Sequence, residues 1–154
     1  MNDDGALRIP RLPPGVRVGI TETMIRNVIH AFYGRIRTDP GLGPIFMRVI
    51  GQSWDSHLAK MCDFWSSVLL STGRFNGTPM QAHISVGGLE ARHFTAWLRL
   101  FRQTVTSQCP ADAAALFMTK AEMIGDSLLL GISTARKNHA STDTPPREKH
   151  RLGE

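Results

Sequence analysis

The stretch WDSHLAKMCDFWSSVL, residues 54–69, carries its apolar side chains at the spacing of an α-helix. These side chains recur every three or four positions, at Trp54, Leu58, Met61, Phe64, Trp65, Val68 and Leu69. Such a stripe covers one face of a helix and is typical of a face buried against other helices. The pattern therefore predicts a long helix that begins after Ser53 and contributes to an α-helical core.

His57 interrupts this apolar face, because it lies three residues after Trp54 and four before Met61. A titratable ring on the most apolar face of a helix is a local inconsistency, and such conflicts are expected at functional sites. A buried histidine with a satisfied hydrogen bond would produce the same pattern. Both interpretations of His57 stay open at the level of sequence.

A short helix with a second notable histidine is predicted downstream, in TPMQAHISV, residues 78–86. Thr78 can cap it and Pro79 suits its first position, which places His83 about one turn inside, beside Met80 and other apolar residues. An imidazole held there with one nitrogen facing an apolar cavity suits the axial ligand of a haem iron. A lone histidine next to apolar residues is, however, more often an ordinary core or surface residue.

Another long helix is predicted upstream of residue 54. Its apolar positions follow the template of a buried helix face, and Thr21 or Thr23 can cap its start; they are Ile25, Val28, Ile29, Phe32 and Ile36. Tyr33, the only tyrosine of the chain, borders this face. One interpretation is a core tyrosine whose hydroxyl is bonded to a carbonyl, and the other is a polar group at a functional site.

The rest of the chain also has helical rather than strand patterns. Residues 89–107 and 111–136 each carry a helical stripe, whereas IFMRVI, residues 45–50, is too brief for a full helix. No strand alternation occurs, so the chain is predicted to be all-α, in a globin-like or bundle arrangement. We expect a flexible N-terminal arm at residues 1–20, one helical domain at residues 21–136 and a disordered polar tail at residues 137–154.

Composition narrows the class of protein. Of the net charge of +5, residues 1–20 contribute +1 and residues 136–154 contribute +2, and no basic stripe interleaved with aromatic residues appears. Nucleic-acid binding is therefore not expected. Cys62 and Cys109 give neither a disulfide framework nor a metal-binding pair. Without an apolar run of about 18 residues or a signal-like start, we expect a cytoplasmic protein that does not bind membranes.

Four segments, FYGRIRTDPGLGPIF, WDSHLAKMCDFW, FNGTPMQAHISV and HFTAWLRLF, follow one another between residues 32 and 101. In their order and spacing they resemble the third group of the truncated haemoglobins. The resemblance implies a globin-like fold, a shortened 2-on-2 helical sandwich around a haem. The glycine pairs that other truncated groups place before the distal helices are missing, which agrees with the third group.

Carried onto this chain, the resemblance implies that His83 ligates the iron of a haem b on the proximal side. On the distal side, Tyr33, His57 and Trp97 would stabilise a bound ligand or control its entry. His57 could make a polar contact, swing outward as a gate or bind the iron itself; the first two roles are favoured. Further residues expected to line the haem are Phe46, Lys60, Met61, Phe64, Trp65 and Met80, of which Lys60 is either a partner of a haem propionate or an ordinary solvated lysine.

The expected ligands are dioxygen, carbon monoxide, nitric oxide or peroxide. Tyr33 and Trp97 both offer hydrogen-bond donors to a dioxygen that has gained negative charge, and a hydrogen bond to a charged group contributes roughly 1.5–3 kcal/mol. Tight retention argues against transport and for redox detoxification, either nitric oxide dioxygenation or peroxide reduction. Either reaction needs a reductase that the sequence does not identify, so a dioxygenase or peroxidase-like activity remains an open expectation.

Two alternatives remain. A haem-based sensor could signal through the basic C-terminal tail, although the chain carries no output domain. A haem-free helical interaction module would use the Trp, Phe and Met stripes simply as core. A zinc site is not expected, because His57 and His83 are 26 residues apart and no further ligand has suitable spacing.

Overall fold

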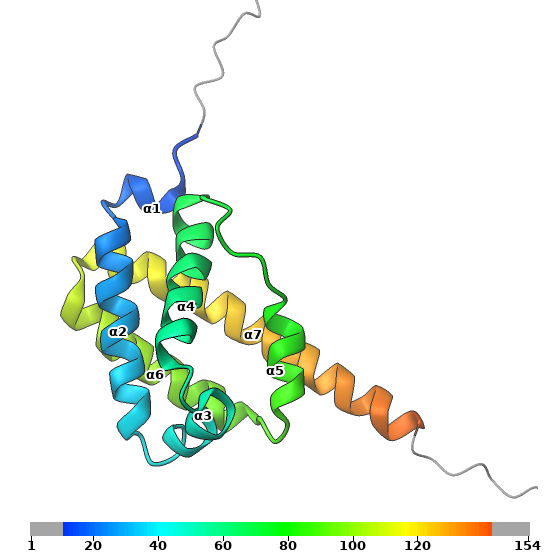
Figure 1. The fold of residues 1–154 in the computed structure, drawn as a ribbon. Coiled ribbons are helices and arrows are strands. Elements are labelled where there is room, and N and C mark those ends of the chain that lie inside the picture. The colour runs from blue at the N-terminus through cyan, green and yellow to red at the C-terminus, as the bar shows by residue number, and fades with distance from the viewer. Residues whose placement is uncertain (1–10, 143–154) are drawn as a thin grey trace, which may run out of the picture.

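The structure is a computed structural model that describes residues 11–142, with side chains described as far as residue 138. This part of the chain is helical and contains no strand, which confirms the predicted all-α class (Figure 1). Its helices are α1 (Pro14–Arg17), α2 (Glu22–Thr38), α3 (Gly43–Ile50), α4 (Trp54–Leu70), α5 (Pro79–Val86), α6 (Ala91–Gln108) and α7 (Ala111–Thr142). None of these helices is long and apolar enough to cross a membrane.

The four long helices form two layers. Helix α2 packs against α4 in one layer, α6 packs against α7 in the other, and α2 joins the layers through its contact with α6. This is the predicted 2-on-2 sandwich. The short helix α5 lies against α7, on the far side of α4 from α2, as Figure 1 shows.

The core forms where the predicted apolar stripes of the two layers meet. The stripe of α2 is buried in full, at Ile25, Val28, Ile29, Phe32 and Ile36. From the other layer come Phe101 and Phe117, and Trp65 of α4 stacks on Phe101 with ring centroids 5.1 Å apart. Burying a side chain of this size stabilises the fold by roughly 1.5–3 kcal/mol. Packing of these rings therefore determines how α2, α4 and α6 sit together.

The segment 45–50, expected to be too brief for a full helix, lies in the short helix α3, which has eight residues. Helix α3 begins at Gly43, with Pro44 in its first turn. The Asp39 carboxylate accepts hydrogen bonds from the backbone N–H groups of Gly41 and Leu42, at 3.0 and 2.8 Å. These bonds and the proline organise the turn in a way that apolar periodicity alone does not indicate.

The ordered region is longer at both ends than predicted. Helix α1 lies within residues 1–20, which were expected to form a loose arm, and it packs on α4. A side chain at Gly15 would collide with the Leu69 carbonyl oxygen, 2.6 Å from the position of its Cβ. Helix α7 continues to Thr142, beyond the expected end at residue 136, because Ala, Lys and Arg keep helix propensity after the apolar stripe has ended. The expectations for residues 1–10 and 143–154 lie outside the described residues.

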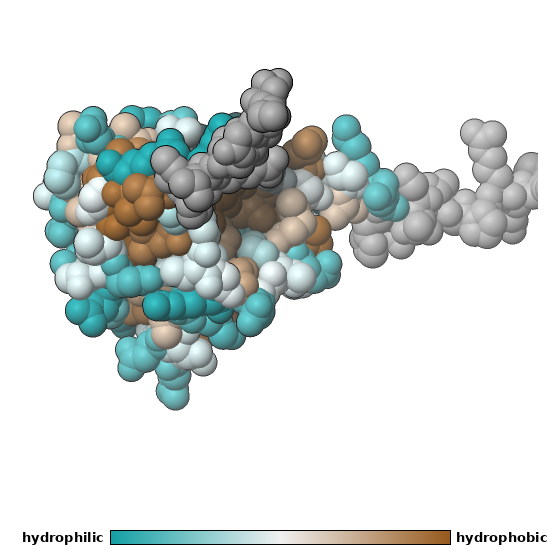
Figure 2. Space-filling view, turned by 90° about the horizontal axis from the view of Figure 1, so that it is seen from above, coloured by the Kyte–Doolittle hydropathy of each residue, from teal (hydrophilic) through white to brown (hydrophobic). Residues whose placement is uncertain are grey.

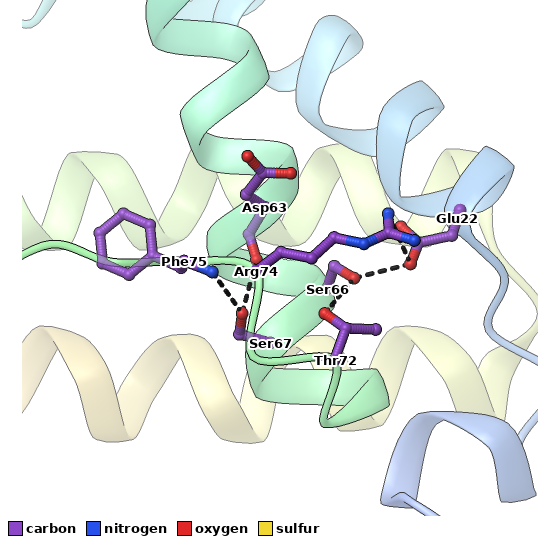
Figure 3. Close-up of polar contacts among 7 residues, drawn as sticks. All are labelled: Glu22, Asp63, Ser66, Ser67, Thr72, Arg74 and Phe75. Atoms are coloured by element: carbon purple, nitrogen blue, oxygen red, sulfur yellow. Dashed lines mark hydrogen bonds and ion pairs between the residues drawn. The ribbon is translucent and has the colours of Figure 1, made fainter.

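Polar contacts anchor the connector between α4 and α5 (Figure 3). The hydroxyl of Ser66, which is fully buried, donates to Glu22 at 2.6 Å and shares a hydrogen bond of 2.8 Å with Thr72. Arg74 pairs with the same Glu22 oxygen at 3.3 Å. One carboxylate at the start of α2 thus holds both the end of α4 and the connector.

A second contact continues this anchoring toward α5. The Ser67 hydroxyl accepts a hydrogen bond from the backbone N–H of Phe75 at 2.9 Å and donates to the Asp63 carbonyl at 2.9 Å, as Figure 3 shows. The Phe75 ring then packs edge-on against Phe64, with centroids 5.2 Å apart. The chain therefore leaves α4 along a defined path.

Helix α5 itself contains no buried residue. Thr78 stands at its N-cap position but makes no side-chain capping bond, which corrects the predicted cap, whereas Pro79 occupies the first turn as predicted. After α5 the chain turns through Gly87 and Gly88, whose φ angles of 70° and 72° are strained for any other residue type.

Candidate functional site

An apolar pocket lies where α3, α5, α6 and α7 approach one another. It brings together three residues predicted for the site, Phe46, His83 and Trp97, which are far apart in the sequence. The rest of its lining consists of Leu42, Leu89, His93, Phe94 and Leu128. Hydrophobic side chains also line a recess on the face of the molecule shown in Figure 2. A concave apolar lining with few polar groups is typical of a ligand or cofactor site.

His83 is held by its own helix. Its Nδ1 lies 2.7 Å from the Pro79 carbonyl oxygen, one turn earlier in α5. Because a carbonyl oxygen only accepts hydrogen bonds, Nδ1 carries a proton, which in the neutral ring leaves the lone pair on Nε2. The backbone therefore favours the tautomer in which Nε2 can bind a metal, and the Pro79 carbonyl is the acceptor that orients such a histidine.

Tyr33 of α2 is buried, with 6% of its surface exposed. Its ring packs edge-on against Phe46 and His57, with centroid distances of 6.0 and 5.0 Å. Within residues 11–138 its hydroxyl makes no hydrogen bond, so the interpretation as a core tyrosine bonded to a carbonyl is not supported. Burial raises the pKa of the hydroxyl, and the nearby Cys62 thiol raises it further. Tyr33 is therefore a protonated, unengaged donor.

His57 of α4 lies beside Tyr33 and is also unsatisfied. Its Nε2 is buried and has no hydrogen-bond partner among the described residues. Burial lowers the pKa of the imidazole, and the charges of Lys60 and His83 lower it further. His57 is thus neutral at neutral pH and is close enough to His83 to sense its charge. A buried polar atom without a partner costs about 1–3 kcal/mol, which points to a group that completes the site.

Trp97 of α6 borders the pocket from the side of the core. Its ring stacks on Phe101 at 5.6 Å with an interplanar angle of 6°, and meets Phe32 edge-on at 5.6 Å. Two fully buried rings therefore hold the indole in place. Trp97 can offer its N–H to a ligand without a large loss of side-chain entropy.

The pocket contains a second imidazole, His93 of α6, to which the sequence patterns assigned no role. Its Nδ1 accepts a hydrogen bond from the backbone N–H of Glu90 at 2.9 Å, and the Glu90 side chain accepts one from the backbone of His93. Since a backbone N–H only donates, Nδ1 of His93 carries no proton and Nε2 carries it. His83 and His93 are therefore opposite tautomers, and only His83 presents a lone pair to the pocket.

The comparisons with known proteins agree with this geometry. No model of a protein family matches the chain. The chain is 32% identical over 108 residues to the "Group 3 truncated hemoglobin ctb" of Campylobacter jejuni, covering 68% of this chain and 85% of that protein. The chain belongs to the group III truncated haemoglobins.

A solved structure supports the same assignment. The "Crystal structure of group III truncated hemoglobin from Campylobacter jejuni" matches this truncated haemoglobin with a TM-score of 0.71 and 29% sequence identity. The match covers 73% of this chain and 91% of the crystal chain. The predicted family and the globin-like fold are both confirmed. As a haem globin, the protein is not the haem-free interaction module considered above.

The residues of the pocket fit a haem. Its apolar walls suit a porphyrin face, and the lone pair on His83 Nε2 would supply the nitrogen donor that the group requires. The buried, unpartnered His57 Nε2 lacks the polar group that an occupied distal pocket would bring. The structure thus satisfies the demands of the cofactor with residues already in position.

Neither Tyr33 nor His57 lines this pocket, and neither do the other residues predicted to contact the haem. Trp65 is buried between Phe101 and Phe117, and Phe64 packs against Trp65 and Phe75. The Met80 thioether lies directly on Gly131 of α7, where a side chain would collide with it. Met61 packs at the edge of the core and Lys60 is exposed. Contact of these residues with a haem stays a prediction.

Sequence reasoning missed several residues of the truncated haemoglobin's pocket. Leu89, Phe94 and Leu128 belong to apolar stripes, so nothing distinguishes them from core residues. Leu42 sits in a Pro/Gly-rich turn that gives no sign of a lining role. Outside the pocket lining, Trp54 was assigned only to a stripe, yet its Nε1 is buried without a partner among the described residues, and its ring centroid lies 6.2 Å from that of Tyr33.

Proposed function

We propose that this truncated haemoglobin binds haem b in the pocket, retains dioxygen tightly and uses it to oxidise nitric oxide in the cytoplasm. The observation that carries the proposal is the buried His57 Nε2, which has no partner among the described residues and stands beside the Tyr33 ring, 5.0 Å between centroids, within reach of the charge of His83. A transport protein needs easy release of its ligand, and such groups oppose release.

The protein's own residues hold and orient the reactants. His83 would bind the iron through Nε2, and the Pro79 carbonyl would keep its ring orientation. Phe46 and the aliphatic lining would exclude water from the porphyrin faces. When bound, the haem supplies a site for a diatomic ligand and a one-electron redox couple.

Tyr33 and Trp97 would retain a dioxygen that has gained negative charge. Both can donate, and burial keeps the Tyr33 hydroxyl protonated across the physiological pH range. A hydrogen bond to a charged acceptor contributes roughly 1.5–3 kcal/mol, which slows ligand release by about one to two orders of magnitude.

The overall reaction is NO + O₂ + e⁻ → NO₃⁻. The electron comes from a one-electron reductase, of the flavin or iron–sulfur class, that restores the ferrous protein after each turnover. The apolar lining of the pocket favours this reaction, because both reactants are small and uncharged.

Peroxide reduction is a second candidate, favoured by the state of His57. Its neutral, unpartnered Nε2 can take a proton from hydrogen peroxide and return it to the oxygen that leaves as water. The balance is H₂O₂ + 2e⁻ + 2H⁺ → 2H₂O, with the same reductase class as the electron source. Nitric oxide oxidation needs no such proton transfer, so His57 separates the two candidates.

Stopped-flow mixing of the reduced, oxygenated protein with nitric oxide tests the proposal. We expect one nitrate per haem, and a His57→Ala variant that still forms nitrate but reduces peroxide about a hundredfold more slowly. Absence of nitrate, together with repeated peroxide turnover by the wild type, would establish peroxide reduction instead. Absence of both products would contradict the proposed redox role.

A further inference from the structure

His93 presents an N–H group to an otherwise apolar part of the pocket. Its Nδ1 is occupied by the Glu90 backbone, so its protonated Nε2, across the ring, points away from that backbone. Besides His83 and Trp97, the other lining residues have apolar side chains and offer neither donor nor acceptor. The His93 N–H is therefore available to an acceptor that a ligand brings into the pocket.

The same edge of the pocket carries a positive charge. Arg136 of α7 donates a hydrogen bond to the carbonyl of Leu89, a lining residue next to Glu90. The Glu90 carboxylate, the acidic group of this edge, is paired with Arg92 at 3.1 Å. The edge thus combines a fixed neutral donor, a guanidinium and a compensated carboxylate, which suits an anionic acceptor.

Resting on the proposed haem binding, we propose that His93 is a positioning residue that donates a hydrogen bond from Nε2 to a carboxylate of the haem. The carboxylates of a haem are its only strongly charged hydrogen-bond acceptors. Because the helix cap already fixes the His93 ring, its N–H can donate to such a carboxylate without a change of side-chain conformation. His93 would thereby fix how the porphyrin is rotated and inserted over His83, while its tautomer prevents it from competing for the iron.

The capping role of His93 allows a sharp pair of variants. His93 is the third helical residue of a capping box, a position that Glu and Gln commonly occupy. His93→Gln keeps both the cap and an N–H donor, whereas His93→Glu keeps the cap but offers only an acceptor and a negative charge. The start of α6 is therefore preserved in both, and equal helix content by circular dichroism verifies this.

The experiment measures the rate of haem transfer from each variant to an excess of an apo-globin acceptor. With ordinary haem we expect His93→Gln to lose haem within about twofold of the wild-type rate, and His93→Glu to lose it about tenfold faster. Each variant is then reconstituted with the dimethyl ester of haem, which lacks the carboxylate charges. There we expect the two variants to differ by less than about twofold.

Equal rates for Gln and Glu with ordinary haem would overturn the proposal. A tenfold difference that persists with the diester would also overturn it, because the effect would then come from the fold or from Glu90. Wild-type haem uptake and nitrate formation test the proposed function separately, so its failure is distinguishable from failure of the His93 contact.

Discussion

The proposed distal and proximal sides of the haem site are built in different ways. On the distal side, Tyr33 and Trp97 stand on long helices whose faces are buried in one aromatic core. On the proximal side, His83 stands on a two-turn helix that contains no buried residue and packs mainly on α7. Packing of side chains orients the distal groups, whereas backbone hydrogen bonds orient the proximal ones.

This difference predicts that the two sides differ in how far their side chains can move. The distal groups cannot move without disturbing Phe32 and Phe101, which are fully buried, and close-packed interiors resist such shifts. Helix α5 is held by the connector contacts of Ser66 and Ser67 and by the glycine turn that follows it. We therefore expect the proximal side to adjust when a haem binds, against a distal side that is already formed.

The largest effect is expected for His83→Gly, which removes the one lone-pair donor of the proximal side. The variant should fail to retain haem unless free imidazole is added to replace the lost ring. Soret absorbance after gel filtration, with and without imidazole, measures this. His30→Ala, at an exposed position of α2, is the control. A normal histidine-ligated spectrum from His83→Gly without imidazole would show that another residue binds the iron.

Phe101→Ala tests whether packing governs the distal side. The ring is fully buried and contacts Trp65, Trp97 and Phe117. We expect a loss of about 3–5 kcal/mol in the free energy of unfolding, measured by urea denaturation of the apo-protein. A loss below about 1 kcal/mol would show that packing around Phe101 does not hold the distal side in place.

Tyr33→Phe tests the distal donor with minimal change in packing. The variant keeps the ring between Phe46 and His57 but removes the hydroxyl. We expect dioxygen to leave the ferrous protein about 10–100 times faster, because a hydrogen bond of roughly 1.5–3 kcal/mol is lost. Stopped-flow displacement of dioxygen by carbon monoxide gives the rate, and an unchanged value would remove Tyr33 from the mechanism.

We expect the free energy of unfolding to depend on pH through the half-buried imidazole of His57. The pKa of His57 lies below its ordinary value of 6.5 in the folded state, chiefly because of burial. Above pH 6.5 the imidazole is neutral in both states, and below it the unfolded chain binds the proton more readily. The apo-protein should therefore lose stability as the pH falls below about 6.5.

Urea denaturation at pH 7.5 and 5.5 measures this loss in the wild type and in His57→Gln. The variant should show a weaker dependence, since the group that resists protonation in the folded state is gone. An identical dependence in both proteins would show that His57 does not contribute. His30→Gln serves as the matched control at an exposed position.

The smallest effect is expected on the proximal side, at Ser67→Ala. This change removes the acceptor of the Phe75 N–H and should cost about 1 kcal/mol in the free energy of unfolding. Ser85→Ala, whose hydroxyl bonds only within α5 to the Gln81 carbonyl, should change it by less than about 0.5 kcal/mol. Equal effects of the two variants would show that the connector does not support α5.

The same contrast explains how much could be predicted from the sequence. The faces of α2 and α4 follow helical periodicity, so Ile25, Phe32 and Leu69 were correctly expected in the core. Resemblance placed Phe46, His83 and Trp97 at one site, and the pocket confirms that they lie together. These predictions succeed because side-chain patterns determine the elements involved.

The features that escaped prediction depend on the backbone or on polar contacts. The Pro79 carbonyl that sets the His83 tautomer has no signature in the sequence, and neither does the Glu90 N–H that sets the opposite tautomer of His93. Helix α1 depends on the close approach of Gly15 to Leu69 rather than on an apolar stripe. Polarity after residue 136 suggested disorder, although helix propensity extends α7 to Thr142.

The central claim is that this pocket holds one haem on His83, facing the donors of the distal side. Optical titration of the purified wild-type chain with haem tests it most directly. We predict that the Soret band saturates at one haem per chain with a histidine-ligated spectrum. A chain that stays colourless after haem supplementation, or that saturates without axial histidine ligation, would contradict the claim.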